Sequence, residues 1–386
     1  MNAAAIVVLA LAGAGILYLV LACAMVFRLA ARRPPEPATW PAVSILKPLH
    51  GAEPRLFENL SSFVEQDYPG PVQILFGVQR PGDSAVAIVR RLIEAYPDRD
   101  LALVVDERSW GENRKVSNLA NLAERARHEV VVLADSDMRV RRDYLRGVVA
   151  CLAEPGVGAV TCPYHGIALP PLPARFVALG IDTHFLPGVT VSVGLGIGHP
   201  CLGSTIALRR ETLEAIGGFQ AIADSLADDH ELGRRIRGQG LAIATTPFSL
   251  GHICVQDSAA ALLAQELRWS RTIRQIEPAG HVGALLTHPL AFALAAFALA
   301  PGPVAGAFVA AALLARLALC IAVERAFRLP PHPYWLIPVR DLLSFFVYAA
   351  SFLGRSVQWR GRQFDVTRKG ALLPRGVTPN TRSDAG

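Results

Sequence analysis

The motif Asp135-Ser136-Asp137 has the clearest chemical meaning in this sequence. It follows directly on the apolar run Val130 to Leu133, which is typical of a buried strand. Carboxylates at the carboxyl end of a strand point into the cleft of an open α/β sheet, where they can hold a hard divalent cation such as Mg2+ or Mn2+ against a diphosphate. Asp and Ser are also frequent turn residues, so the motif alone is equally consistent with an ordinary turn.

Three further groups carry charge at positions where a cleft is expected. Asp83 lies in the turn after the apolar run Val72 to Val78, and the pair Asp228-Asp229 lies near the start of a predicted helix. A third group, Gln265-Glu266-Leu267-Arg268-Trp269, joins a guanidinium to an aromatic ring just before a long apolar region. Each has a structural alternative, because acidic residues stabilise helix N-termini and an Arg-Trp pair can anchor a helix at a membrane surface.

In their order and spacing these groups resemble the D, D, D, (Q/R)xxRW signature of processive and lipid-directed glycosyltransferases with a GT-A fold. More narrowly, the chain resembles the ceramide glucosyltransferase family and its bacterial relatives, the glycosyltransferases associated with hopanoid biosynthesis. The resemblance runs from the first apolar stretch into the distal one and covers most of the chain. The other segments that carry it are Lys47-Pro48-Leu49, Gln66-Asp67-Tyr68-Pro69, Asn113-Arg114-Lys115-Val116-Ser117-Asn118-Leu119 and Gly217-Gly218-Phe219.

The resemblance implies a role for each carboxylate. Asp229 would be the general base on the acceptor hydroxyl, with inversion at the anomeric carbon. Two adjacent carboxylates can exchange roles, so Asp228 stays open as an alternative. Asp135 and Asp137 would bind the divalent metal and the diphosphate of a UDP-sugar, and Asp83 would bind its uracil or ribose.

Further roles follow from the same resemblance. Lys115 would contact the nucleotide side of the donor. Gln265 and Arg268 would bind the diphosphate, to which a planar guanidinium can donate two hydrogen bonds, and Trp269 would line the acceptor site. The secondary candidates are Gly203 and Ser204, in a loop where glycine lets the backbone approach a ligand, together with Asp228 and His230.

Two observations qualify this interpretation. The second motif is Asp-Ser-Asp here, whereas ceramide enzymes more often have Asp-Ser-Gly; the change favours a metal ligand at Asp137 and weakens the inference of ceramide as the acceptor. Histidines can add ligands or acceptor contacts, although most have structural roles. The candidates are His184, His199, His230 and His252.

The elements between the motifs predict an α/β fold. Short apolar runs alternate with helical patterns, which indicates a parallel sheet covered by helices. The predicted strands are Val43 to Leu46, Val72 to Val78, Leu101 to Val105, Val130 to Leu133 and Val157 to Cys162, and the predicted helices include Ala85 to Ala95, Val116 to Ala126 and Arg142 to Leu152. The segment Pro170 to Gly198 breaks the pattern, and its apolar, Gly- and Pro-rich composition fits either a membrane-surface segment or a buried loop.

The composition also predicts a membrane protein. Hydrophobic residues make up 52% of the chain, and Ala3 to Phe27 contains no charge. This run is long enough to span a bilayer and longer than the core of a cleaved signal peptide, so we expect an uncleaved anchor. Arg28, Arg32 and Arg33 follow it and predict, by the positive-inside rule, that the next domain lies in the cytoplasm.

A second apolar region lies near the other end of the chain. It divides into Val282 to Ala300, Val304 to Val323 and Tyr334 to Leu353, and a basic tail follows. Two crossings and a re-entrant or interfacial third segment would keep that tail inside and let Arg340 and Asp341 find partners. We therefore expect an anchor over 1–33, a cytoplasmic GT-A domain over 34–280, two or three membrane helices over 281–354 and a flexible tail over 355–386.

Charge and cysteine content exclude other classes. The net charge of +6 is dispersed, which disfavours nucleic acid and fits attraction to anionic lipid headgroups. The six cysteines form no CxxC pair, which argues against zinc and against a disulfide framework and suits a reducing cytoplasm.

The leading hypothesis is a UDP-sugar-dependent lipid glycosyltransferase of a bacterial inner membrane. Within it we favour N-acetylglucosamine transfer to a polyhydroxylated hopanoid over glucose transfer to ceramide. A processive polysaccharide synthase shares the signature, but this chain has little material for a polymer channel. A membrane scaffold that has kept a transferase fold is the non-enzymatic alternative. The sequence does not determine the oligomeric state.

Overall fold

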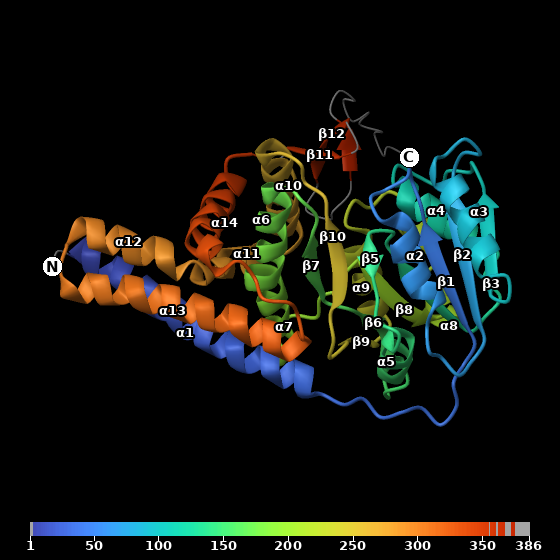
Figure 1. Ribbon diagram of the computed structural model, residues 1–386, viewed down its shortest axis with the longest axis horizontal. Helices are drawn as coiled ribbons and strands as arrows, with labels where there is room; N and C mark the ends of the chain where they lie inside the picture. Colours follow the sequence, from blue (N-terminus) through green and yellow to red (C-terminus); the bar gives the residue numbers. More distant parts are fainter. Residues whose placement is uncertain (1–2, 355, 360–361, 367–371, 375–386) are drawn as a thin grey trace, which may run out of the picture.

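The computed structural model describes residues 3–354, 356–359, 362–366 and 372–374. Figure 1 shows a sheet covered by helices on one side of the molecule and an arm of long helices on the other. A third group of helices lies between them. This arrangement places the carboxyl ends of the strands close to the helical region.

A seven-stranded sheet forms the centre of the part of the molecule opposite the arm. Its order is β3-β2-β1-β4-β8-β6-β9, and only β8 runs antiparallel to its neighbours. The predicted parallel sheet is confirmed, and every predicted strand is present within two residues at either end. The strands are β1 (Val43–Pro48), β2 (Val72–Val78), β3 (Asp100–Val105), β4 (Val130–Ala134), β6 (Val157–Thr161), β8 (Thr205–Arg209) and β9 (Ala242–Thr245).

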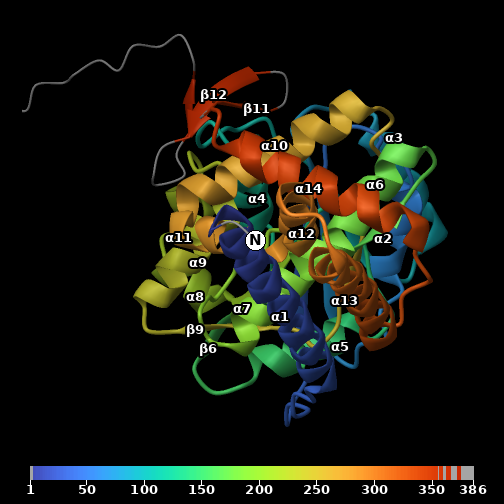
Figure 2. The ribbon, with the colours of Figure 1, turned by 90° about the vertical axis from the view of Figure 1, so that its left-hand side faces the viewer.

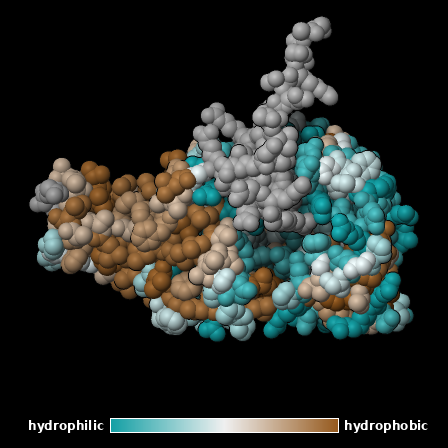
Figure 3. Space-filling model, turned by 90° about the horizontal axis from the view of Figure 1, so that it is seen from above, coloured by the Kyte–Doolittle hydropathy of each residue, from teal (hydrophilic) through white to brown (hydrophobic). Residues whose placement is uncertain are grey.

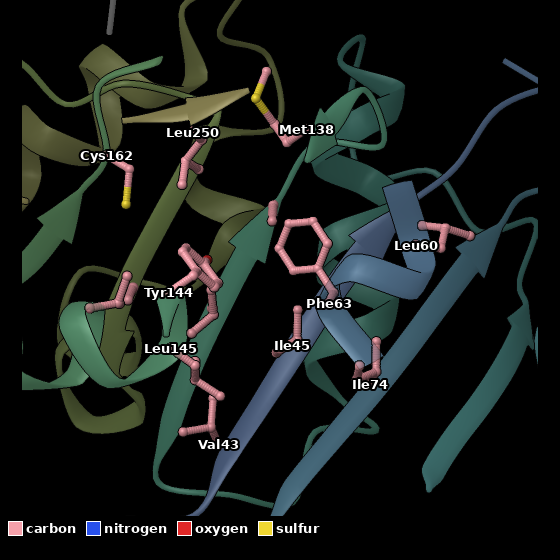
Figure 4. Close-up of a cluster of buried hydrophobic side chains, with 14 of the residues drawn as sticks. Val43, Ile45, Leu60, Phe63, Ile74, Met138, Tyr144, Leu145, Cys162 and Leu250 are labelled. Atoms are coloured by element: carbon pink, nitrogen blue, oxygen red, sulfur yellow. The ribbon is translucent and has the colours of Figure 1, made fainter. Parts of the chain in front are cut away.

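Alternation along the strands divides the core into two layers. On β4, Val130 and Val132 face one hydrophobic cluster, whereas Val131 and Leu133 face another. The first cluster, shown in Figure 4, packs under α2 (Leu56–Val64), α3 (Ala85–Ala95) and α5 (Tyr144–Leu152). The second packs under α4 (Arg114–Ala123), α8 (Arg210–Ala215), the 3-10 helix η2 (Phe219–Ile222) and α9 (Asp228–Gly238).

A small second sheet lies beside the carboxyl ends of the main strands. It consists of β5 (Met138–Arg139), β10 (Leu250–Cys254) and β7 (Tyr164–Ala168), in that order. The register pairs His252 of β10 with Met138 on one side and with Gly166 of β7 on the other. The strand β10 therefore runs directly past the end of the Asp135-Ser136-Asp137 motif.

The arm consists of apolar helices that pack on one another. Helix α1 (Ala3–Ala31) contacts α12 (Pro289–Leu299) and α13 (Pro303–Phe327), as Figure 2 shows along the arm. Both α1 and α13 are long and apolar enough to span a membrane, and the arm is the most hydrophobic part of the surface in Figure 3. The predicted segment Val282 to Ala300 is not one straight helix, because the chain bends by 58° between Thr287 and Pro289.

Of the two interpretations of the segment Pro170 to Gly198, the buried loop is wrong, because the segment is helical. The segment Leu172–Gly194 is continuously helical and consists of helix α6 (Leu172–Gly180), the π-helical turn η1 (Ile181–Phe185) and helix α7 (Leu186–Gly194). In its most apolar stretch of 18 residues, 67% is buried. Its prolines misled the prediction. They lie in the first turns of α6 and α7, where a missing N–H is tolerated.

Helix α14 (Ile337–Ser351) is too short to be a candidate span by itself. Its buried charges find partners, as predicted, on three other elements. Arg340 pairs with Glu266, and Asp341 Oδ1 lies 2.7 Å from Arg316 Nε and 3.0 Å from His184 Nε2. These contacts tie α14 to α13, to the π-turn η1 and to the helix that carries the Arg-Trp motif.

The segment predicted as a flexible tail contains described strands. These are β11 (Ser356–Trp359), β12 (Arg362–Val366) and β13 (Leu372–Pro374), which form a three-stranded antiparallel sheet. The rest of the predicted tail lies outside the described residues.

We predict that removing only one partner of the buried ion pair between Arg316 and Asp341 lowers the free energy of unfolding more than removing both. Arg316→Met should lower the free energy of unfolding by about 3–5 kcal/mol, because it leaves an uncompensated carboxylate in the interior. The double variant with Asp341→Leu should lose less. Thermal unfolding in detergent, followed by circular dichroism, measures both. Arg325→Met, at an exposed position on the same helix, is the control, and a double variant as unstable as Arg316→Met would contradict the argument.

Candidate active site

The Asp135-Ser136-Asp137 motif lies at the carboxyl end of β4, as predicted. The Asp135 N–H donates to the carbonyl of Ser204 at 3.1 Å, and the Lys47 Nζ donates to the Asp135 carbonyl at 2.5 Å. These two contacts fix the backbone of the motif between β1 and β8. The side chains of Asp135 and Asp137 stay 31% and 38% exposed, so both can reach a ligand at the sheet edge.

The second carboxylate pair meets the first through Lys115. Lys115 Nζ lies 2.7 Å from Asp135 Oδ1 and 3.5 Å from Asp228 Oδ2. Asp229 is held by backbone groups instead: its Oδ2 accepts from the Gly203 N–H at 2.8 Å, and its Oδ1 from the His230 N–H at 2.7 Å. Residues that are far apart in the sequence therefore form one cluster.

Local capping explains the position of Lys115. Asn113 is the N-cap of α4, and its side-chain oxygen accepts from the N–H groups of Lys115 and Val116. The Asn113 amide also donates to the Ser225 carbonyl at 2.8 Å, in the loop just before α9. One asparagine thus connects the first turn of α4 to the segment that carries Asp228.

Aromatic residues and a histidine surround Asp137. His252 Nδ1 lies 3.4 Å from Asp137 Oδ2, and its ring centroid is 5.5 Å from that of Tyr164 and 6.4 Å from that of Trp269. Tyr164 in turn stacks on Phe185 of the π-turn at 4.4 Å. His252 therefore lies between Trp269 and Asp137 of the Asp135-Ser136-Asp137 motif, beside the helices of the central group.

The Arg-Trp motif lies on helix α10 (Ala259–Ile276). Glu266 within it binds the Arg340 guanidinium through both oxygens, at 2.5 and 2.9 Å, and Gln265 accepts a hydrogen bond from Gln256. Burial lowers the pKa of Arg268, and no carboxylate in the described part of the chain pairs with this guanidinium. Arg268 is thus a partly buried cation that an anionic ligand can use.

Asp83 lies at the same sheet edge but apart from the cluster. It follows β2, two strands from β4 in the sheet, and its side chain contacts the loop after β1 and the first residue of α3. Its Oδ1 accepts from the N–H groups of Gly51 and Ala85, both at 2.9 Å, and its Oδ2 lies 3.5 Å from His50 Nδ1. This position fits a distal part of a ligand that reaches across the strand ends.

Burial and mutual attraction set the charges in the cluster. Burial raises the pKa values of Asp135, Asp228 and Asp229, which Lys115 opposes. For Lys115 itself, burial favours the neutral form, but attraction to Asp135 and Asp228 raises its pKa overall. Lys47 is fully buried, and the loss of hydration lowers its pKa to about 7 despite the nearby carboxylates.

The cluster suits a divalent cation. Four carboxylates lie around two lysines. Even when both lysines carry a positive charge, the ionised carboxylates outnumber them, and the cluster has an excess of negative charge. Asp137 Oδ1 and His252 Nδ1 are buried without a hydrogen-bond partner, which is unusual for polar atoms. Carboxylate oxygens of Asp135 and Asp137 and a nitrogen of His252 are ligands of the kinds that Mn2+ and Mg2+ accept, so these residues could hold such an ion.

Sequence reasoning placed some site residues and missed others. Gly203 and Ser204 contact the two carboxylate pairs, as their loop suggested, and His230 contributes its backbone N–H. Of the four candidate histidines, only His252 lies beside the metal motif. Lys47 and Tyr164 were not assigned to the site. The signal for Lys47 was its position directly after the first strand, whereas nothing near Tyr164 in the sequence marks it.

Comparison with known proteins identifies the family of this chain. The model of the family described as glycosyl transferase family 21 matches residues 5–372. The chain belongs to this family. As a family 21 member it is a glycosyltransferase, which disfavours the scaffold alternative, and its apolar helices fit a membrane-associated enzyme.

Relatives and a solved structure support the same assignment. Ceramide glucosyltransferase 3 of Caenorhabditis elegans is 24% identical over 360 residues, 88% of this chain and 76% of the relative. Ceramide glucosyltransferase 1 of the same organism is 25% identical over 61% of this chain and 49% of its own length. The mannosyltransferase PcManGT of Pyrobaculum calidifontis, solved with GDP-Man and Mn2+, has 24% identity and a TM-score of 0.50, covering 90% of this chain and 99% of that one. That likeness supports the GT-A fold.

We predict that Gly203→Ala impairs the family 21 site without unfolding it. A Cβ on Gly203 would lie 3.1 Å from Asp229 Oδ2 and 3.4 Å from its Cγ, so the carboxylate must shift by a few tenths of an ångström. Small displacements of a catalytic group are costly, and we expect kcat to fall about tenfold or more. Steady-state kinetics measure this. The control is Gly238→Ala on the same helix as Asp229, where an added Cβ meets no atom within 4 Å, and equal kcat in both variants would contradict the prediction.

Proposed function

We propose that this family 21 enzyme is an inverting glycosyltransferase that moves a sugar from a UDP-sugar to a hydroxyl group of a membrane lipid. The observation that carries the proposal is the Lys115 bridge between Asp135 and Asp228. It joins a metal-type motif to the carboxylate pair at the start of α9. A donor diphosphate and an acceptor hydroxyl can therefore be held on two sides of one cluster.

On the donor side, Asp135, Asp137 and His252 would hold the divalent cation. When bound, Mg2+ or Mn2+ would neutralise negative charge on the diphosphate as it departs. The solved mannosyltransferase with GDP-Man and Mn2+ supports a metal and a nucleotide sugar in this fold. The remaining donor contacts would come from this chain's Asp83 at the nucleoside and from Arg268 with Gln265 at the diphosphate.

On the acceptor side, Asp229 is the better base of the two neighbours. Asp228 faces the Lys115 ammonium, whereas Asp229 is oriented by two backbone N–H groups. Burial raises the pKa of Asp229, which makes its carboxylate a stronger proton acceptor. Asp229 takes the hydroxyl proton while the acceptor oxygen bonds to the anomeric carbon, and the bond to the diphosphate breaks to release UDP.

The lipid would approach along the helices beside Trp269. This ring packs on a cluster from α6, η1 and α10, and α14 connects the same helices to the arm. We place the catalytic region on the cytoplasmic side of a bacterial inner membrane, because Arg28 lies in the last turn of α1 and Arg32 and Arg33 follow the helix. Arg32 donates to the Thr245 carbonyl at 3.0 Å, so the end of this anchor is docked on the catalytic region.

For the acceptor we propose a polyhydroxylated hopanoid that receives N-acetylglucosamine. The Asp-Ser-Asp form of the metal motif supports this choice, because it departs from the form more common in ceramide enzymes. Glucose transfer to ceramide is the second candidate, and the ceramide glucosyltransferases among the relatives favour it.

Asp229→Asn should abolish transfer but retain donor binding. The amide keeps the size of the side chain but cannot accept the proton, so we expect kcat to fall about 10²–10⁴-fold. Calorimetric titration with UDP-sugar and a transfer assay measure the two effects separately. Asp228→Asn is the matched variant, and it should lose less. If Asp228→Asn proves the more damaging, the two carboxylates have the opposite roles.

The acceptor class can be identified by product mass. Purified enzyme with UDP-N-acetylglucosamine or UDP-glucose should glycosylate hopanoid polyols and leave ceramide unmodified, as measured by lipid mass spectrometry. Asp229→Asn protein is the negative control. A hexosylceramide product would support the second candidate, and a polymer made from donor alone would instead indicate a processive synthase.

A further inference from the structure

A buried group of metal-type ligands lies at the C-terminal end of α13, apart from the active site. Cys320 and Glu324 are one helical turn apart, so both face the same side of α13, and His332 follows the helix. One ligand atom of each lies within 4.8 Å of the other two. His332 Nδ1 lies 2.8 Å from Glu324 Oε1, and Cys320 Sγ lies 3.7 Å from the same oxygen.

The chain turns sharply to bring His332 to this position. Helix α13 ends at Phe327, and Arg328 adopts a left-handed conformation with φ 57°. The Leu329 N–H then donates to the Glu324 carbonyl at 2.9 Å, and the His332 N–H donates to Glu324 Oε1 at 2.8 Å. Backbone contacts therefore hold the imidazole over the last turn of the helix before any ligand is considered.

A second set of contacts surrounds these three residues. His332 Nε2 lies 2.7 Å from Asp182 Oδ2, and the Tyr334 hydroxyl donates to Glu324 Oε2 at 2.6 Å. Asp182 is 1% exposed and lies on the π-turn η1, a feature often found at functional sites. In metal sites the second ring nitrogen of a ligating histidine usually donates to a carboxylate, which is the arrangement of His332 and Asp182.

We propose that Cys320, Glu324 and His332 bind a structural divalent transition metal of the zinc class. A thiolate, an imidazole and a carboxylate are ligands that zinc accepts together, and a water molecule would complete a tetrahedral set. Binding would release the Cys320 thiol proton and leave His332 neutral, with its Nε2–H on Asp182. The 2.8 Å contact between His332 and Glu324 would open to about 3.3 Å, the separation of two tetrahedral ligands at normal zinc distances.

The negative charge buried at this site favours the binding of a divalent cation. Asp182 is 1% and Glu324 is 8% exposed, so these two carboxylates are costly unless a cation compensates them. The competing arrangement is a protonated His332 between Asp182 and Glu324, with a neutral Cys320. The two differ in whether the sulfur is a ligand, and that difference can be measured directly.

The site would also stabilise the active site at a distance. Asp182 uses its other oxygen to accept from the Gly166 N–H at 2.9 Å, on β7. Gly166 pairs with His252 of β10, which lies beside Asp137. A metal that holds His332 against Asp182 would therefore help to keep β7 and β10 in register beside the catalytic motif. Its ligands include only one cysteine, which is why the absence of CxxC pairs did not reveal it.

Metal content of the purified full-length protein tests the proposal without an activity assay. The protein is purified with an affinity tag that lacks histidine. Inductively coupled plasma mass spectrometry should then find about one zinc ion per chain. Cys320→Ser and His332→Gln should lose this zinc. Two variants should keep it: Cys23→Ser, which changes a cysteine of α1 outside the cluster, and Asp137→Asn, which removes a ligand of the catalytic cation.

Cobalt substitution gives a second readout that requires no variant to fold. Wild-type protein loaded with Co2+ should show a thiolate-to-cobalt charge-transfer band, because a thiolate ligand gives this band and oxygen and nitrogen ligands do not. The proposal is overturned if the wild type takes up neither zinc nor cobalt at equimolar metal, if cobalt binds without the sulfur band, or if Cys320→Ser keeps full zinc occupancy.

Discussion

The repulsion between clustered carboxylates is the constraint on which the site depends. Asp135, Asp137, Asp228 and Asp229 come from two separate segments, and two like charges 4 Å apart repel by roughly 4 kcal/mol at an effective dielectric constant of 20. Lys115 offsets part of this repulsion because its ammonium faces Asp135 and Asp228. The excess that remains creates the affinity for a cation, and the cation in turn attracts a diphosphate.

The membrane-type helices are part of this site rather than only its anchor. The motif helix α10 is held by the ion pair between Glu266 and Arg340, and the π-turn η1 is held by contacts from Arg316, Asp341 and His332. These groups are buried, so each would be costly without its partner. The consequence is that helix α10 and the π-turn η1 keep their positions only when the central helices and the arm are packed together.

Sequence patterns predicted the sheet region well and the helical region less well. Strand β2 and helix α3 begin and end at the predicted residues, because alternation and helical periodicity report on burial against a nearby sheet. For the segment from Pro170 to Gly198 the prediction left a membrane-surface segment and a buried loop open, since its apolar, Gly- and Pro-rich sequence shows no clear amphipathic period; the structure has helices there. Its surroundings, formed by α1, α10, α13 and α14, are distant in the sequence and left no local signal.

The sequence by itself determined which groups could act. The order and spacing of Asp83, Asp135, Asp137, Asp229 and Arg268 resemble the signature of lipid-directed glycosyltransferases, and this resemblance indicated the class of enzyme. Only the tertiary structure decided which partners those groups have. His252 and Tyr164 beside Asp137, Lys115 between the carboxylate pairs and Arg340 on Glu266 all depend on long-range packing. The physical reason is that a local pattern encodes the burial of an element, whereas a contact between side chains depends on how distant elements are oriented.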